Sequence, residues 1–257
     1  AFFQPVLATS GAEALRRIAQ DRPDAVVTDF FLPDMTAPDL LGHLRNDPAT
    51  AQIPVIVLAS GTGPAARLAA FEAGADDVLA KPLNEDTLLA RLRNLMRMAA
   101  GVADLGAGGL APETRELAEA RAFYDTPGLI AILSDRPDLA LRRRIGLERL
   151  VRDRGGVQTP GDAMMAVARA DAALPDVYLI DADLGGAGGG LRLLSDLRSK
   201  SQTRHAAVCL LHGPNSPVTA AMAFDLGASD IAAADTGPEE IAARIRRLIR
   251  RKRGLDR

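Results

Sequence analysis

Two aspartates occupy the same position in two similar stretches of the sequence. Asp29 ends the apolar run of PDAVVTDFFLPDM at 23–35, and Asp181 ends that of PDVYLIDADLGGA at 175–187. An aspartate at the carboxyl end of a strand can cap the next helix, bind a metal ion or act as a nucleophile. Because capping or plain solvation is the commoner case for an isolated aspartate, the choice depends on the neighbouring residues.

A lysine provides that context in the first stretch. The segment VLAKPLNED places Lys81 at the end of another predicted strand, with Pro82 after it. Parallel strands present their carboxyl ends at one edge of a sheet, and ligands and chemistry gather at that edge. We therefore expect Asp29 and Lys81 to lie opposite each other. Such a pair is more specific than a surface lysine, and it favours a nucleophilic role for Asp29.

The similarity between the two stretches extends along the chain. FEAGADDVLA at 71–80 matches FDLGASDIAA at 224–233, an offset of 153 residues, while Asp29 and Asp181 are offset by 152. One extra residue in the second copy fits its glycine-rich run at 185–190. The shared order and spacing predict a duplication, with a first domain at 1–98, a linker at 99–127 and a second domain at 128–257.

Each copy alternates short apolar runs with amphipathic stretches. In the second copy the runs at 128–134, 176–181, 207–213 and 229–235 predict strands. Helices are predicted at 136–153, 161–174, 191–200, 217–227 and 237–253; the first of these carries Leu139, Ile145 and Leu147 at helical spacing. The pattern indicates an α/β fold, with five-stranded, parallel, doubly wound sheets of the flavodoxin type.

The first copy starts late relative to the second. By the 152-residue offset, Ala1 corresponds to position 153, so about 25 residues with the first strand and first helix have no counterpart. The first strand is central in a sheet of order 2-1-3-4-5. We therefore expect the native protein to contain this segment; donation of the strand by another chain is the alternative.

These motifs resemble bacterial response regulator receiver domains, of the CheY-like type, arranged in tandem. Asp29 with LPDM resembles the phosphoacceptor and its loop, and FEAGADDVLAKP resembles the segment that ends in the family's Lys-Pro pair. The chain resembles more closely the paired receivers of PleD-type proteins, which carry a C-terminal GGDEF diguanylate cyclase. No GGDEF sequence is present here.

The resemblance implies a phosphorylation site at Asp29. A histidine kinase or phosphotransfer protein would supply the phosphoryl group, and Lys81 would pair first with Asp29 and then with a phosphoryl oxygen. Mg²⁺ would be bound by the Asp29 carboxylate, the backbone carbonyl of Phe31 and an acidic residue in the missing first strand. Where the family usually has Ser or Thr, this chain has Ala59, and Ser60 could substitute through a shifted loop.

The second copy departs further from the family pattern. Asp181 and Asp135 remain, but Ser134 replaces an acidic residue, His212 takes the hydroxyl position and Ala234-Asp235 replaces Lys-Pro. Because the lysine is absent, the carboxylates would face a phosphoryl group with less compensation. We predict that Asp181 is poorly phosphorylated or silent, and that this copy is an adaptor. The arginines of ALRRRIGLER fit a solvated face or a dimer contact.

Composition limits the possible partners. The net charge is −2, the basic C-terminal run has no interleaved aromatic residues, and no apolar run approaches the length of a membrane span. We expect a cytoplasmic protein that binds neither nucleic acid nor membrane, and Cys209 as its single cysteine fits a reducing compartment. The resemblance implies a homodimer and a C-terminal output domain. A stand-alone double-receiver adaptor and an unphosphorylated dimerisation scaffold remain as alternatives.

Overall fold

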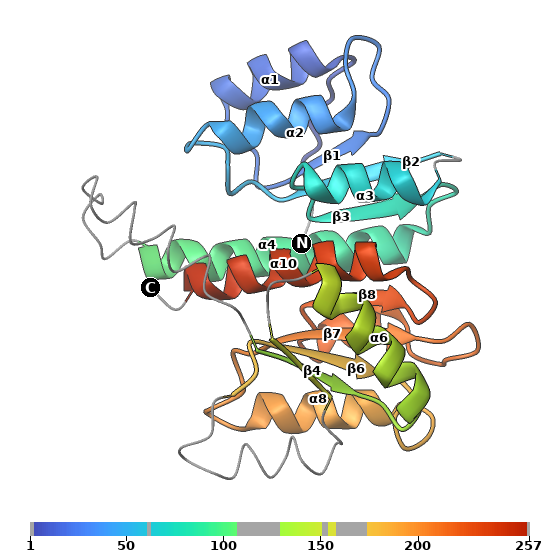
Figure 1. Ribbon diagram of the computed structural model, residues 1–257. Coiled ribbons are helices and arrows are strands. Elements are labelled where there is room, and N and C mark those ends of the chain that lie inside the picture. The colour runs from blue at the N-terminus through green and yellow to red at the C-terminus, as the bar shows by residue number, and fades with distance from the viewer. Residues whose placement is uncertain (1–2, 61–62, 107–128, 151–153, 158–173, 256–257) are drawn as a thin grey trace. The chain divides into compact units, whose positions relative to one another are not determined.

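The computed structural model describes residues 3–60, 63–106, 129–150, 154–157 and 174–255 (Figure 1). The chain divides into two compact units, Ala1–Ala100 (unit 1) and Gly101–Arg257 (unit 2), and each is described by itself. Within the described residues, no helix is both long and apolar enough to cross a membrane.

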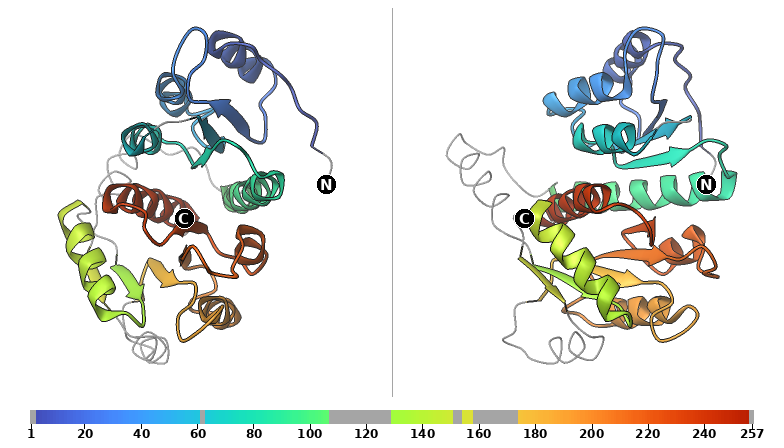
Figure 2. Two further views of the ribbon diagram at one scale, coloured as in Figure 1. Left: turned by 90° about the vertical axis from the view of Figure 1, so that its right-hand side faces the viewer. Right: turned by 45° about the vertical axis from the view of Figure 1, so that its right-hand side comes forward.

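Unit 1 is built on a three-stranded parallel sheet in the order β1-β2-β3. Figure 2 shows α4 on the opposite side of this sheet from α2 and α3. The fully apolar β2 is central, which explains its burial. In chain order the elements are α1 (Gly11–Gln20), β1 (Val26–Asp29), α2 (Ala37–Asn46), β2 (Val55–Ala59), α3 (Pro64–Glu72), β3 (Asp77–Ala80) and α4 (Glu85–Gly106).

Unit 2 contains a five-stranded parallel sheet in the order β5-β4-β6-β7-β8. By position along the chain this is the predicted order 2-1-3-4-5. The helix predicted for 161–174 falls almost entirely on residues outside the described part. The described elements are β4 (Leu129–Leu133), α6 (Pro137–Leu150), β5 (Arg154–Val157), β6 (Val177–Asp181), α8 (Gly189–Ser199), β7 (Ala207–His212), α9 (Ala220–Asp225), β8 (Asp230–Ala233) and α10 (Pro238–Leu255).

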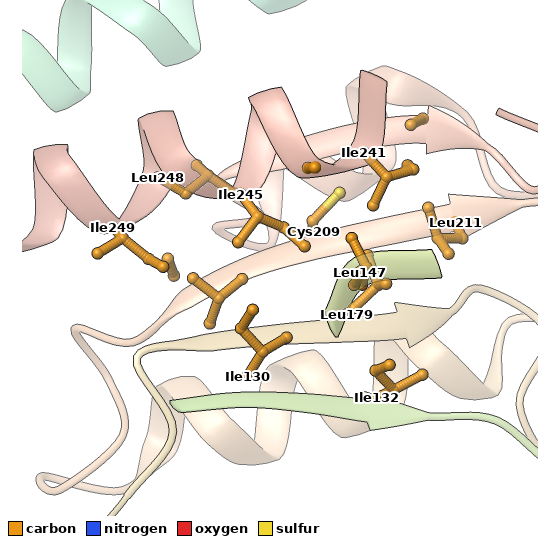
Figure 3. Packing of buried hydrophobic residues seen from close by; sticks show 14 of the residues in the cluster. Ile130, Ile132, Leu147, Leu179, Cys209, Leu211, Ile241, Ile245, Leu248 and Ile249 are labelled. Atoms are coloured by element: carbon orange, nitrogen blue, oxygen red, sulfur yellow. The ribbon is translucent and has the colours of Figure 1, made fainter. Parts of the chain in front are cut away.

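One hydrophobic core of unit 2 lies between a face of this sheet and the helices α6 and α10 (Figure 3). Ile130, Leu179 and Cys209 project from successive strands toward Ile245 of α10 and Leu147 of α6. Burial of apolar surface is the main stabilising term here, at about 25 cal/mol per Å². Cys209 is buried in this cluster, where it packs as a small apolar residue.

The predicted duplication is visible in the hydrogen bonds. Arg45 Nε donates to the Gly74 carbonyl at 3.1 Å, and Arg198 Nε donates to the Gly227 carbonyl at 3.0 Å, with both partners offset by 153 residues. Burial lowers the pKa of Arg198 to about 10, so this side chain stays charged at neutral pH. Both units thus join the end of one helix to the glycine turn before the last strand in the same way.

The two units differ at the strand that ends in the aspartate. In unit 2, β6 pairs with β4 on one side and β7 on the other, whereas β1 pairs with β2 alone among the described strands. Val27 of β1 is 41% exposed, while its counterpart Leu179 is 1% exposed beneath α6. The described part of unit 1 therefore lacks counterparts of β4 and α6. That the native protein supplies them remains a prediction.

Candidate functional site

The sheet of unit 1 brings Asp29 and Lys81 together at the carboxyl ends of its strands. Asp29 ends β1 opposite Leu58 of β2, and Lys81 follows β3, where its backbone N–H donates to the Ala59 carbonyl at 3.0 Å. The Lys81 Nζ lies 2.6 Å from the Asp29 Oδ1. The two side chains, expected at one edge, are therefore in direct ionic contact.

Solvent reaches this ion pair. The Asp29 side chain is 50% exposed and that of Lys81 is 37% exposed. An exposed ion pair adds only about 0–1 kcal/mol to stability. The fold therefore gains little from this contact, and the carboxylate remains accessible to an incoming group.

The loop after Asp29 provides a second oxygen donor. Phe30 is buried, while Phe31 is exposed and forms an isolated bridge with Thr36. In the described part of the chain, the Phe31 carbonyl accepts no hydrogen bond. Carboxylate and carbonyl oxygens are the ligands that Mg²⁺ prefers, so these two residues suit that ion. No group of three or more His, Cys, Asp and Glu side chains that could hold a metal occurs among the described residues.

In unit 2, Asp181 occupies a closed version of the same site. Its side chain is 5% exposed, and its Oδ1 accepts a hydrogen bond from Arg143 NH1 at 2.6 Å. The Ser134 hydroxyl donates to Oδ2, and Arg136 NH2 lies 3.6 Å from that oxygen. Asp135 instead accepts a hydrogen bond from the Gly185 N–H at 3.2 Å. Less compensation was expected here because the lysine is absent, but α6 supplies Arg143 as a cation beside Asp181.

The comparisons with known proteins agree with this geometry. The family model "Response regulator receiver domain" matches residues 3–93. Response regulator MprA of Mycobacterium leprae is 34% identical over 158 residues, which cover 56% of this chain and 67% of that protein. The chain belongs to the response regulator receiver family. It is therefore a component of two-component signalling.

A second relative aligns with both units. Response regulator PleD of Caulobacter vibrioides is 29% identical over 258 residues, which cover 99% of this chain and 55% of PleD. The receiver chain thus spans about half the length of that relative. A solved structure, a response regulator receiver domain protein of Clostridium thermocellum, is 19% identical, with a TM-score of 0.42 and coverage of 49% of this chain and 97% of the other.

The hydroxyl position of the first receiver remains a departure from the family pattern. Ala59 is buried at the end of β2, and Ser60 is exposed directly after it. Residues 61 and 62 lie outside the described part. A contact between Ser60 and a bound phosphoryl group is therefore still a prediction.

Asp34 has a structural role in this receiver that the sequence reasoning missed. Its carboxylate accepts hydrogen bonds from the backbone N–H groups of Gly11 at 2.8 Å and Ala12 at 2.9 Å, so it caps the start of α1. These bonds lower the pKa of the Asp34 carboxyl. The loop that follows the candidate phosphoacceptor is thereby tied to α1. The sequence around Asp34 gives no signal for this contact, because Gly11 and Ala12 lie more than 20 residues earlier in the chain.

Replacing Asp34 with alanine should therefore destabilise unit 1 in a pH-dependent way. A carboxyl whose pKa is lowered by folding stabilises the protein above its unfolded pKa, at about 4, and this contribution is lost as the pH falls through the folded value. Urea unfolding, with hydrogen exchange in α1 as the local probe, should show that Asp34→Ala is less stable than the wild type at pH 7. The difference should shrink below pH 4. Asp24→Ala, at an exposed position before β1, serves as the control, and an equal loss in both variants would contradict the capping role.

Proposed function

We propose that Asp29 is the phosphoacceptor of this receiver chain and that a sensor histidine kinase or phosphotransfer protein is the donor. The supporting observation is the 2.6 Å contact between Asp29 Oδ1 and Lys81 Nζ at a solvent-exposed sheet edge. A carboxylate oxygen of Asp29 attacks the phosphorus of a phosphohistidine, and the P–N bond breaks. The bond electrons stay with the imidazole, which takes up a proton. The Lys81 ammonium then pairs with a phosphoryl oxygen.

Mg²⁺ is the expected cofactor of this step. The Asp29 carboxylate and the Phe31 carbonyl would hold it, with an acidic residue of the predicted first strand as a further ligand. When bound, the ion neutralises charge on the transferred phosphoryl group. Lys81 supplies the other positive charge, and it holds the Asp29 carboxylate in place before the donor arrives.

The proposed consequence of phosphorylation is a change in how the receivers pack and dimerise. Similarity to PleD through both units supports an arrangement in which unit 1 accepts the phosphoryl group and unit 2 is an adaptor. In a longer native protein the regulated output would be a C-terminal diguanylate cyclase. We place this module in the cytoplasm, without nucleic acid or membrane as partners. An unphosphorylated scaffold is the second candidate, favoured by the buried Ala59 at the hydroxyl position.

Sedimentation velocity of the full-length protein tests this function. Beryllofluoride with Mg²⁺ imitates an aspartyl phosphate, because it binds a carboxylate oxygen with the shape and charge of a phosphoryl group. We expect its addition to shift the protein to a larger species through dimerisation. An unchanged sedimentation profile would contradict phosphorylation-controlled dimerisation and favour the scaffold.

A further inference from the structure

Arg143 of α6 contacts both Asp181 and Ala234, the residue at the lysine position of unit 2. Its NH1 donates to Asp181 Oδ1 at 2.6 Å, and its NH2 donates to the Ala234 carbonyl at 3.3 Å. Ala234 is the counterpart of Lys81: its backbone N–H donates to the His212 carbonyl at 2.8 Å, as that of Lys81 does to the Ala59 carbonyl. The guanidinium therefore provides the positive charge that the lysine provides in unit 1.

The two sites differ in accessibility. The Arg143 side chain is 12% exposed and that of Asp181 is 5% exposed, whereas the Asp29–Lys81 pair is open to solvent. The difference follows from what covers each aspartate. In unit 2, β4 pairs with the strand that ends in Asp181, and α6 brings Arg143 over it between the buried Ala140 and Leu147. The described part of unit 1 has no counterparts of these two elements.

Both carboxylate oxygens of Asp181 are already engaged. Arg143 binds Oδ1, and Ser134 with the more distant Arg136 occupies Oδ2. Because both oxygens are taken by partners in a site where Asp181 is only 5% exposed, a divalent cation at this carboxylate would have to displace the Arg143 guanidinium or the Ser134 hydroxyl. The approach of a phosphoryl group to the same oxygens is closed for the same reason.

We propose that Arg143 is a built-in counter-cation that closes the unit 2 site to Mg²⁺ and to phosphoryl-like ligands. Unit 2 is thereby held in one state, and unit 1 alone responds to the kinase. The inference rests on the proposed function for the class of ligand. It also gives a new reason why Asp181 should not be phosphorylated. The absence of the lysine is not the cause; a different cation, Arg143, already occupies the site.

¹⁹F NMR of the full chain with Mg²⁺ and beryllofluoride tests this proposal, because each occupied carboxylate gives its own set of bound-fluoride resonances. The Asp29→Asn protein, which removes the unit 1 acceptor, should show no bound resonances. Adding Arg143→Met and Ala234→Lys rebuilds the unit 1 arrangement around Asp181, and bound resonances should appear. They should disappear again when Asp181→Asn is added.

A matched control lies on the same helix. Arg144 is exposed and pairs with Glu148 at 2.7 Å, so Arg144→Met combined with Ala234→Lys in the Asp29→Asn background should leave the site closed. Bound resonances in the Asp29→Asn protein with Arg143 intact would overturn the proposal. So would their absence from a folded Arg143→Met/Ala234→Lys variant. The Asp29 resonances of the wild type report on the proposed function separately, since they do not depend on Arg143.

Loss of folding in the Arg143 variant is addressed by a second measurement. Arg143→Met leaves a buried carboxylate without its main partner, which should lower the urea midpoint of unit 2. Asp181→Asn removes that charge, so the double variant should recover part of the loss, and hydrogen exchange in β6 should show the same recovery. If the double variant lost as much stability as the two single variants together, the Arg143–Asp181 pair would be contradicted.

Discussion

Replacing Asp29 with asparagine should abolish the response of the chain to Mg²⁺ and beryllofluoride. Asparagine keeps the shape of the side chain but carries no charge, so it is a weaker Mg²⁺ ligand and offers no carboxylate oxygen to the phosphoryl analogue. We expect apparent affinity for the analogue to fall by about 100-fold or more, equivalent to about 2.7 kcal/mol. Titration calorimetry measures the loss of affinity for the analogue. The sedimentation profile measures the loss of the change in oligomeric state.

Two further variants separate the chemistry from the fold. Asp24→Asn changes an exposed aspartate before β1 and should respond as the wild type does. Lys81→Met keeps the acceptor but removes the cation 2.6 Å from it, so we expect weaker analogue binding, by about 10-fold. A full response from the Asp29→Asn protein would show that the acceptor lies elsewhere.

The largest stability effect should come from Leu179→Ala. Leu179 lies in the core of unit 2 and contacts the cluster formed by α6 and α10 (Figure 3). Truncating a buried leucine removes apolar contacts and leaves a cavity, at a cost of about 3 kcal/mol within a usual range of 2–5 kcal/mol. Urea unfolding, with hydrogen exchange in β6 and β7 to localise the change, measures this loss.

Val27→Ala is the control at the equivalent position of unit 1. Because Val27 is exposed, its truncation should cost less than about 1 kcal/mol in the 257-residue chain. The same substitution should cost more in a longer protein that contains the predicted first strand and helix. Equal losses at Leu179 and Val27 in the 257-residue chain would contradict the difference in burial.

The strand order and the edge position of Asp29 could be predicted because local patterns determine them. Apolar runs such as 207–213 are too short for helices, and parallel alternation restricts the topology to few choices. With the 153-residue offset, each element predicted in one unit also predicts its counterpart in the other. Contacts such as Arg45 to Gly74 were not predicted, because nothing near Arg45 in the sequence identifies a carbonyl in a distant turn.

The closure of the unit 2 site was missed for a different reason. Arg143 reaches Asp181 from 38 residues away, and only the rotation of α6 decides which of its arginines points at the sheet. The apolar spacing was misleading, since Ile145 is 45% exposed. The buried side of α6 instead carries Ala140 and Leu147, three residues before and four after Arg143. Those small and apolar neighbours are the signal that could have identified Arg143 as the inward arginine.

The central claim is that Asp29 carries the phosphoryl group and Asp181 does not. Acetyl phosphate with Mg²⁺ provides a donor without a kinase: a carboxylate oxygen attacks the phosphorus, the P–O bond to the acetyl group breaks and acetate leaves. Peptide mass spectrometry of the full-length protein then locates the acyl phosphate. We predict modification in the peptide that contains Asp29 and none in the peptide that contains Asp181. Modification chiefly at Asp181, or labelled protein with Asp29 unmodified, would contradict it.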